Sequence, residues 1–526
     1  MRVLGLTLVI VFGWTVSGAE ASCSGSGQTW NCTAGTTPAQ INAAIASASD
    51  GATFTFAAGS YTWGGGTVIA PPLDKGISLV CESQGACDVF YSGGFPGVWR
   101  PGCCTGGSSS RFYRISGFHF TAGTGATIWF AWDDSPETTL SQLRVDHNTW
   151  TLGDDDIWML TSNRTALYLY GVIDHNVITA ASMANTIAFQ YTAGYDSSSP
   201  PLNRMGTDRN LFVEDNVITS TVGGGAGCLD AFGTSTGWVW RFNTITNCRL
   251  TTHGVMHSWG PSNVEYYGNR LIYNASATFP DGFRAIHHQG SGQFGFWKNS
   301  FTSASPLGDA MAVLHYRSFQ PAGAPACNGT NSLDGNRSPS STYLGYPCFH
   351  QPGRDLDGLL YPGFAFLNVN AATNAKVDLE INGSGSGPPD YTNTHFKFDR
   401  DVYNAVGASA QSSSTSPFNG TTGIGHGTLA NRPATCTTTT EAADAGRGGV
   451  LYWATDQGNW NSSTSNPNGV QQNGADGVLY MCTATNTWSV YYAPYAYPHP
   501  LQSGGAPPGG GGGGVPSAPS NLRIVP

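Results

Sequence analysis

The chain is poor in charge, and above all in lysine. Only 11% of its 526 residues are charged, against about 25% in typical soluble domains. Lysine occurs only at Lys75, Lys298, Lys376 and Lys397, and the net charge is −10. No basic face is therefore available to neutralise a row of phosphates, and we expect no nucleic-acid partner.

Long apolar runs are also missing after the first residues. The opening "MRVLGLTLVIVFGWTVSGAEA", residues 1–21, has one positive charge, a short apolar core and a small-residue end. This pattern predicts a signal peptide cut before Ser22, since a membrane span needs about 20 apolar residues. We therefore expect a secreted protein, extracellular or at the cell surface, with no membrane span; a membrane anchor is the alternative.

No paired Cys-x-x-Cys spacing occurs among the twelve cysteines, which disfavours a metal centre and favours disulfides in an oxidising compartment. Close spacing predicts four pairs: Cys23 with Cys32, Cys228 with Cys248, Cys327 with Cys348, and Cys436 with Cys482. The pairing of four further cysteines stays open: Cys81, Cys87, Cys103 and Cys104.

Helical periodicity is absent, and a repeat of short strand-like segments takes its place. Segments such as "GVIDHNVITA" and "LFVEDNVITS" each carry an asparagine followed by β-branched or aromatic residues. The repeated asparagines are Asn148, Asn176, Asn216, Asn243, Asn269 and Asn299, separated by 28, 40, 27, 26 and 30 residues. This period predicts a solenoid in which the amides bond from coil to coil as a ladder. A β-sandwich, the alternative, would turn about every 8 to 12 residues.

These repeats resemble the right-handed parallel β-helix proteins of the pectin-lyase-like superfamily. The segment "TPAQINAAIASASDGATFTFAAGSYTW", residues 37–63, looks like the N-terminal cap and first coil of that family. The resemblance extends from residue 36 to about residue 405. It implies an all-β right-handed parallel β-helix, a fold that hosts many reactions and some inert scaffolds.

Composition divides the chain into four parts. After the signal peptide, residues 22–405 form the predicted parallel β-helix domain. Residues 406–501 form a predicted small C-terminal β module, whose aromatic residues indicate a packed core. Residues 502–526 are rich in Gly and Pro and predict a flexible tail.

The candidate site follows from strand parity, because successive side chains of a strand point to opposite faces. Six apolar residues were aligned as inward positions of successive coils: Leu167, Phe189, Leu229, Met256, Ile286 and Leu314. The residues after them then face outward as one row: Tyr168, Gln190, Asp230, His257, His287 and His315. Two residues further on, the same face carries Tyr170, Thr192, Phe232, Trp259, Gln289 and Arg317.

This row suits an extended polysaccharide. His257 or His287 could act as a base near neutral pH, and Arg317 could neutralise a substrate carboxylate or the developing charge. His315 is a further catalytic candidate of the same row. Asp230 could act as a general acid, orient a histidine or ligate a cation. The remaining residues of the row are predicted to bind substrate: Tyr168, Tyr170, Gln190, Phe232, Trp259 and Gln289. Polar decoration of a solvated face is the alternative for the whole set.

Parity separates the neighbours in "FRAIHHQG". His288 and Arg284 should point inward or lie at a bend, so a structural role is expected for His288. Polygalacturonases of this fold carry paired aspartates, a His-Gly and an Arg-Ile-Lys; here Asp230, His253 and Arg284 fall in that order, without the second aspartate or the lysine.

The leading prediction is an extracellular polysaccharide-active enzyme, either a lyase or a glycoside hydrolase. No cofactor is required by the sequence; calcium is the one ion considered, at the acidic turn of Asp154, Asp155 and Asp156, where a solvated turn is the alternative. The rival function is a non-catalytic surface, adhesive or filament-forming protein that self-assembles through its C-terminal module. A phage tailspike fits less well, because a signal peptide has no use there.

Overall fold

The structure is a computed structural model. It describes residues 21–91, 97–102, 107–122, 128–129, 138–152, 157–158, 167–180, 187–190, 205–221, 229–232, 237–253, 263–274, 285–288, 292–303, 307, 310–314, 352–353, 360–382, 398–404, 418–439, 444–463 and 476–503. Residues 1–20 of the predicted signal peptide and residues 504–526 of the predicted tail lie outside these ranges. Within the described part of the chain, no helix has both the length and the apolar character to span a membrane.

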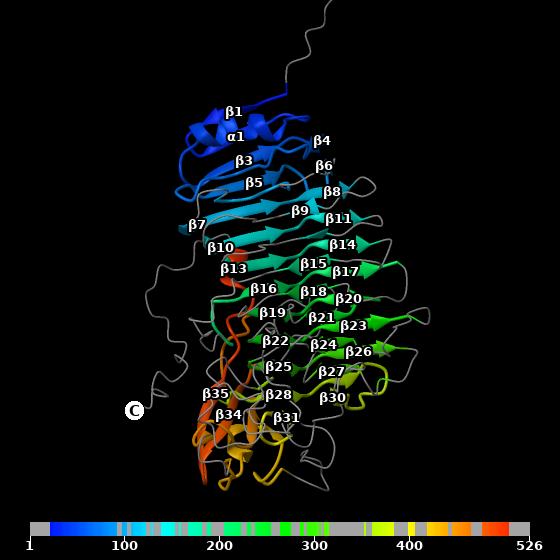
Figure 1. Cartoon of the computed structure of the whole chain (residues 1–526), viewed down its shortest axis with the longest axis vertical. Coiled ribbons are helices and arrows are strands. Elements are labelled where there is room, and N and C mark those ends of the chain that lie inside the picture. The colour runs from blue at the N-terminus through cyan, green and yellow to red at the C-terminus, as the bar shows by residue number, and fades with distance from the viewer. Residues whose placement is uncertain are drawn as a thin grey trace, which may run out of the picture.

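Three long sheets wind around one apolar core, and the chain visits them in turn along the coil stack (Figure 1). Their strands are parallel, except for an antiparallel pair at the N-terminal end. The fold is thus an all-β parallel β-helix, as predicted.

The thirteen-stranded sheet consists of β1 (Cys23–Ser26), β2 (Thr29–Cys32), β3 (Ala52–Phe56), β5 (Ile77–Cys81), β7 (Gly107–Ser116), β10 (Thr138–Asp146), β13 (Leu167–Asp174), β16 (Leu211–Glu214), β19 (Trp238–Arg241), β22 (Val264–Tyr267), β25 (Phe294–Trp297), β28 (Gly363–Phe366) and β31 (Val402–Asn404). The ten-stranded sheet consists of β4 (Gly59–Trp63), β6 (Cys87–Tyr91), β8 (Phe118–Ala122), β11 (Thr149–Leu152), β14 (Val177–Ala180), β17 (Val217–Ser220), β20 (Thr244–Thr246), β23 (Arg270–Tyr273), β26 (Ser300–Ser303) and β29 (Val369–Asn370). The eight-stranded sheet consists of β9 (Ile128–Trp129), β12 (Ile157–Trp158), β15 (Ile187–Gln190), β18 (Leu229–Phe232), β21 (Leu250–His253), β24 (Ile286–His288), β27 (Met311–Leu314) and β30 (Leu379–Asn382).

Alternation of apolar and polar residues explains the strands of the ten-stranded sheet. In β17, Ile218 is buried while its neighbours Val217 and Thr219 are half-buried. The same pattern recurs in β20 around Ile245. One face of this sheet therefore packs on the core and the other meets solvent.

The predicted asparagine ladder is confirmed at the corner between the thirteen-stranded and ten-stranded sheets. The Oδ1 atom of Asn216 accepts hydrogen bonds from the backbone N–H and the Nδ2 of Asn176, at 2.9 and 3.0 Å. The ladder continues one coil further than predicted, because Asn368 accepts the same pair of bonds from Asn299. The residue before each ladder asparagine turns the corner in the left-handed region, as Asp215 does with φ of 59°.

A short helix, α1 (Pro38–Ser47), covers the N-terminal end of the coil stack (Figure 1). Thr37 caps it by accepting a bond from the backbone N–H of Gln40, whose side chain reaches back to the N–H of Thr37. This capping box, with Pro38 in the first turn, fixes where the helix begins. Its buried residues Ile41 and Ile45 join the core.

The C-terminal module forms a four-stranded sheet of β32 (Ile424–Gly427), β33 (Leu451–Ala454), β34 (Val478–Ala484) and β35 (Thr487–Tyr492). Two short 3-10 helices accompany it, η1 (Leu429–Asn431) and η4 (Pro500–Ser503). Trp453 is fully buried and packs against Trp297 and Phe366 on the outer face of the thirteen-stranded sheet. The module is therefore anchored on the β-helix by a second apolar core.

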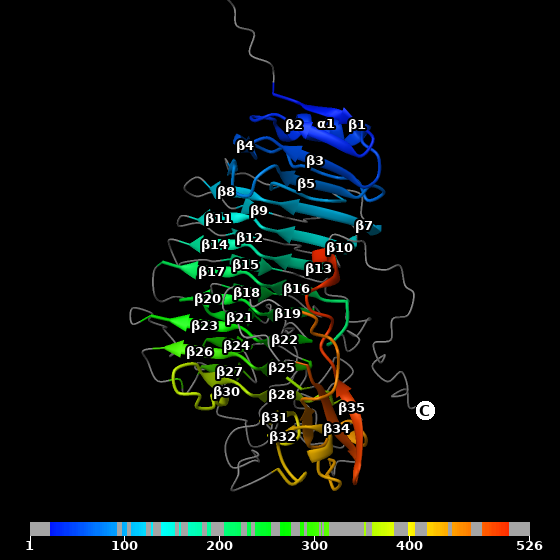
Figure 2. The same cartoon turned by 180° about the vertical axis from the view of Figure 1, so that it is seen from behind.

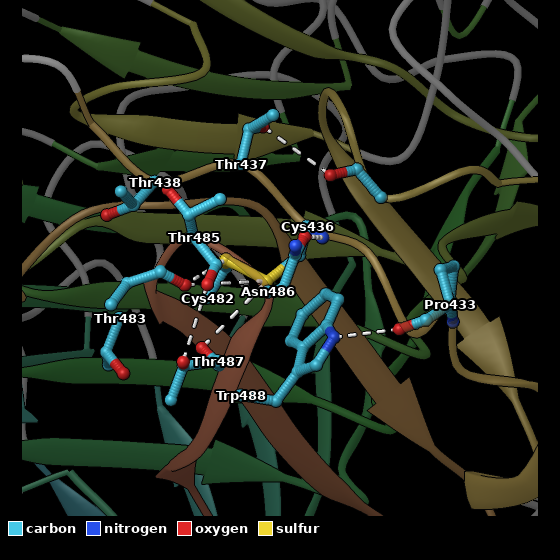
Figure 3. The surroundings of a disulfide bond; sticks show 12 residues. Pro433, Cys436, Thr437, Thr438, Cys482, Thr483, Thr485, Asn486, Thr487 and Trp488 are labelled. Carbon is cyan, nitrogen blue, oxygen red and sulfur yellow. Dashed lines mark hydrogen bonds between the residues drawn. A yellow bond between two sulfur atoms is a disulfide. The ribbon is translucent and has the colours of Figure 1, made fainter.

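Two of the predicted disulfides are present, Cys23–Cys32 and Cys436–Cys482. The second joins the start of the module to β34, and Asn486 accepts a bond from the backbone N–H of Cys436 beside it (Figure 3). Cys81 pairs with Cys87, which settles part of the pairing that the sequence left open. Cys248 is also in a disulfide. Its predicted partner and the remaining cysteines lie outside the described residues: Cys103, Cys104, Cys228, Cys327 and Cys348.

Candidate functional site

One row of residues crosses all strands of the eight-stranded sheet in register. Each member is the pairing partner of the next, from β9 to β30. We call it the outer row; it consists of Trp129, Trp158, Ala188, Asp230, Thr251, His287, Ala312 and Glu380.

Three members of this row, Thr251, His287 and Glu380, lie on the face turned away from the core. Leu250 and Ile286, which precede Thr251 and His287, belong to the core cluster, and so does Leu379, which precedes Glu380. Since side chains alternate along a strand, these three members take the opposite face. Neighbouring strands lie about 4.8 Å apart, so the eight positions extend over about 34 Å.

His287 and His288 lie on opposite faces of β24, as parity predicted. His288 points into the core, where its ring lies 5.1 Å from that of Phe294 and its Nδ1 contacts the Thr252 hydroxyl at 3.3 Å. Complete burial lowers the pKa of His288 to about 3, so the ring stays neutral. Only 4% of the surface of His287 is exposed, so this residue is shielded from bulk water.

The register corrects the predicted alignment of the coils. Leu229 pairs with Leu250 and not with Met256, so Thr251 takes the place beside Asp230 that the sequence assigned to His257. Gln190 lies two positions further on than predicted and pairs with Phe232. Both errors have one cause: further apolar residues occur at positions of the same parity, six residues after Leu250 at Met256 and two residues after Ile187 at Phe189, so the pattern alone does not fix the register.

Other residues of the predicted row belong elsewhere. Leu167, Tyr168 and Tyr170 lie in β13, which is part of the thirteen-stranded sheet, so the two tyrosines do not share a sheet with Asp230. Met311 and Val313 are the buried positions of β27, so Leu314 has the parity of His287 and was wrongly aligned as inward.

Several predicted site residues fall outside the described residues: His257, Trp259, Arg284, Gln289, His315 and Arg317, together with Thr192 and the acidic turn of Asp154, Asp155 and Asp156. In the described part of the chain, no group of three or more His, Cys, Asp or Glu side chains is arranged to hold a metal ion.

The register also reveals members of the row that sequence reasoning missed. Trp129 and Trp158 were visible as an Ile-Trp dipeptide that recurs one coil apart, in "TIWF" and "DIWM". His253, which the sequence singled out only as part of a His-Gly pair, is not in the outer row and pairs with Phe232 in the parallel row two residues on. Thr251 and Glu380 gave no signal, because Thr251 is one of two neighbouring threonines and Glu380 is a single polar residue between Leu379 and Ile381.

A second polar row lies on the outer face of the thirteen-stranded sheet. Asp146, Asp174 and Glu214 follow one another in register. Arg144 binds Asp174 through two bonds of 3.0 and 2.9 Å, and Arg241 donates to Glu214. All five side chains are buried beneath the C-terminal segment.

At the adjoining corner, two partly exposed histidines stack, with ring centres of His147 and His175 5.0 Å apart. The Nδ1 of His175 bonds the buried carboxylate of Asp174 at 2.9 Å. Burial alone would lower the pKa of His175, but this bond and the nearby carboxylates raise it. The corner is thus built around paired charges.

In the part of the chain that the structure describes, the outer row is the candidate site, because its register brings an acid, a histidine and two tryptophans into one line. The buried row on the other sheet is occupied by contacts with the protein's own C-terminal segment. No protein-family model matches this chain, and no curated protein matches it either.

Proposed function

We propose that the protein is a secreted polysaccharide-active enzyme that holds an extended glycan along the outer row. The observation that carries this proposal is the register of Asp230, Thr251 and His287 at three adjacent strand positions. A carboxyl group and an imidazole about 10 Å apart along the backbone leave room for a sugar between them.

The rest of the row supports a long ligand over a small one. Trp129 and Trp158 occupy two adjacent positions at its N-terminal end. Aromatic rings offer apolar faces on which sugars can stack. Phe232, Gln190 and His253 occupy the parallel row beside it. Because Thr251 and His287 are 5% and 4% exposed, a polymer that follows the coil axis reaches them only if the groups that cover them move aside.

Of the two predicted reactions, elimination fits the described residues better than hydrolysis. An inverting hydrolase needs two carboxyl groups about 6.5 to 9.5 Å apart, and a retaining one needs about 5 Å. The carboxylate residues of the described outer row are Asp230 and Glu380, four strands or about 19 Å apart. Their side chains are too short to close that distance.

Elimination on a uronate chain needs a base, an acid and a positive group that neutralises the substrate carboxylate; the sequence predicts this last role for Arg317, which lies outside the described residues. In the proposed reaction, His287 takes the proton from the carbon next to the uronate carboxylate. The bond from the neighbouring carbon to the glycosidic oxygen breaks, and Asp230 in its acid form protonates that oxygen. The electrons of the broken C–H bond form a carbon–carbon double bond, which absorbs in the ultraviolet.

A product screen tests the proposal. Purified protein is incubated with acidic and neutral glycans, while absorbance reports unsaturated ends and a reducing-end assay reports hydrolysis. We expect absorbance to rise with a uronate polymer, and His287→Ala to lower the rate by 100-fold or more, as removal of a general base does.

Two matched variants separate chemistry from folding. His288→Ala should cost more stability than activity, because His288 packs in the core. His119→Ala removes a half-buried histidine of the ten-stranded sheet, bonded to Asp88, and should leave the rate unchanged. Equal losses of activity from His287→Ala and His288→Ala would contradict the site. No turnover on any glycan, with ordered polymers in electron micrographs, would favour the non-catalytic filament instead.

A further inference from the structure

Two histidines stack at the corner between the thirteen-stranded and ten-stranded sheets. His147 lies between β10 and β11, and His175 lies between β13 and β14, one coil further along (Figure 2). Both have the left-handed backbone of this corner, with φ of 55° and 54°. Their rings are parallel within 4°, and the ring centres are 5.0 Å apart.

A buried carboxylate holds the same nitrogen of each ring. Nδ1 of His147 lies 2.8 Å from Oδ2 of Asp146, and Nδ1 of His175 lies 2.9 Å from Oδ2 of Asp174. Each carboxylate belongs to the residue just before its histidine, so the two rings are held in the same way. Their Nε2 atoms are therefore separated by about the same distance as the ring centres.

These carboxylates also fix the tautomer of both rings. Arg114 donates to both oxygens of Asp146, at 2.7 and 2.6 Å, and Arg144 donates to both oxygens of Asp174, at 3.0 and 2.9 Å. A carboxylate paired in this way stays an anion and only accepts hydrogen bonds. Nδ1 of each imidazole must therefore carry the proton, so Nε2 of the neutral ring has a free lone pair.

The Nε2 atoms of the pair remain for a ligand from outside. The side chains of His147 and His175 are 41% and 33% exposed, and the described residues give neither Nε2 a hydrogen-bond partner. His119, on the adjoining ten-stranded sheet, differs in this respect. Asp88 holds its Nδ1, and its Nε2 contacts the Thr151 hydroxyl at 3.1 Å. Both nitrogens of His119 are therefore in use.

The spacing of the two rings suits a metal ion after a small tilt. A tetrahedral ion with bonds of about 2.05 Å to nitrogen holds two ligand nitrogens about 3.4 Å apart. From a separation of 5.0 Å, each Nε2 must move about 0.8 Å toward the other. A ring that pivots about its Nδ1 makes this shift while it keeps the bond to its carboxylate.

Charge at the corner also favours a cation. Asp215 occupies the same corner one coil further and acts electrostatically on His175. Burial raises the pKa of Asp215 to about 7, so it is an anion in mildly alkaline solution. The other charged groups beside the stack form ion pairs: Arg114 with Asp146, Arg144 with Asp174, and Arg241 with Glu214. The described part of this corner therefore has one negative charge in excess, which a bound cation offsets.

We propose that His147 and His175 bind a divalent transition-metal ion, of the class of Cu²⁺, Ni²⁺ and Zn²⁺, through their two Nε2 atoms. Imidazole nitrogen suits these ions, and histidines that bind metal commonly donate their other N–H to a carboxylate. Two protein ligands leave the remaining positions to water, so the ion is held less tightly than by three histidines. The site belongs to a different part of the coil from the outer row, and its ion joins two successive coils.

Calorimetry of the metal-free full chain at about pH 8, where protons compete little for Nε2, tests the site. CuCl₂ should bind more tightly than NiCl₂ or ZnCl₂. CaCl₂ should not bind at these residues, because Ca²⁺ takes oxygen ligands. Electron paramagnetic resonance of the Cu²⁺ form should show coupling to two imidazole nitrogens.

Glutamine variants assign the ion to the pair. His147→Gln and His175→Gln keep an amide N–H for the buried carboxylate but lose the metal-binding nitrogen, so each should weaken Cu²⁺ binding at least about tenfold. His119→Gln is the matched control and should leave the affinity unchanged. Undiminished Cu²⁺ binding in both folded variants of the pair, or no Cu²⁺ binding by the unmodified protein, would overturn the proposal. Binding of sulfate in place of the metal, lost in the same two variants, would also overturn it and would assign the pair to an anion.

Discussion

Single side chains decide how the coils of this protein are joined. The side chain of Asn216 makes five hydrogen bonds: its Nδ2 donates to the carbonyl oxygens of Ile173 and Glu214 and to Oδ1 of Asn243, and its Oδ1 accepts twice from Asn176. Buried amides are stable only when their donors and acceptors are satisfied. One amide per coil therefore satisfies polar groups in the coils on either side.

Asn216→Ala should lower the free energy of unfolding by about 3 to 5 kcal/mol, because it leaves several buried groups without partners at about 1 to 3 kcal/mol each. Chemical denaturation measures this loss. Thr219→Ala, on the solvated face of the neighbouring strand, is the matched control and should stay within about 0.5 kcal/mol. If Asn216→Ala lowered the free energy of unfolding by less than about 1 kcal/mol, water would be satisfying the polar groups that the ladder satisfies here.

The ladder and the inward face of His288 could be predicted from the sequence, since both depend on local pattern. An asparagine at a fixed point of every repeat is visible without knowing the length of the loops. The membership of the outer row could not be predicted in the same way. It depends on which apolar residue begins each strand, and "LTTHGVMHS", residues 250–258, offers both Leu250 and Met256 as starting points.

At the scale of elements, the strands of the C-terminal module are held by one long covalent link. Cys436 and Cys482 are 46 residues apart in sequence, and Trp488 closes the same region by donating to the Pro433 carbonyl at 2.8 Å (Figure 3). Composition indicated that a small β module lies here. It gave no sign that residues 493–503 return to the β-helix, because those contacts join groups more than 250 residues apart.

Replacing both Cys436 and Cys482 by Ser should destabilise the module by about 4 kcal/mol, on the loop-entropy estimate for a loop of this length. Cys23 and Cys32 are only 9 residues apart in sequence. Replacing both by Ser should therefore lower stability less, by about 2.5 kcal/mol. Hydrogen exchange of β33 and β34 against β2 and β3 separates the two effects. A larger loss of stability after replacement of Cys23 and Cys32 than after replacement of Cys436 and Cys482 would contradict this account.

At the scale of the whole molecule, the coil stack repeats the same spacing between neighbouring strands along its length. Sequence reasoning predicted the stack and one polar face of it, and the structure supplied the register that aligns Asp230 with His287. Because each coil adds one position, the proposed site is a line about 34 Å long, in contrast to a pocket. Its length is therefore its most testable property.

Binding of a uronate oligosaccharide series to the His287→Ala variant, measured by calorimetry, tests the line most directly. We predict that affinity rises with chain length until the glycan spans the outer row and then levels off. Trp129→Ala and Trp158→Ala are then added to that variant. They should remove only the extra binding free energy of the longest chains, about 1 to 3 kcal/mol in total, because the ring contacts are lost. An affinity already complete at two or three sugars, or no binding at any length, would contradict the account.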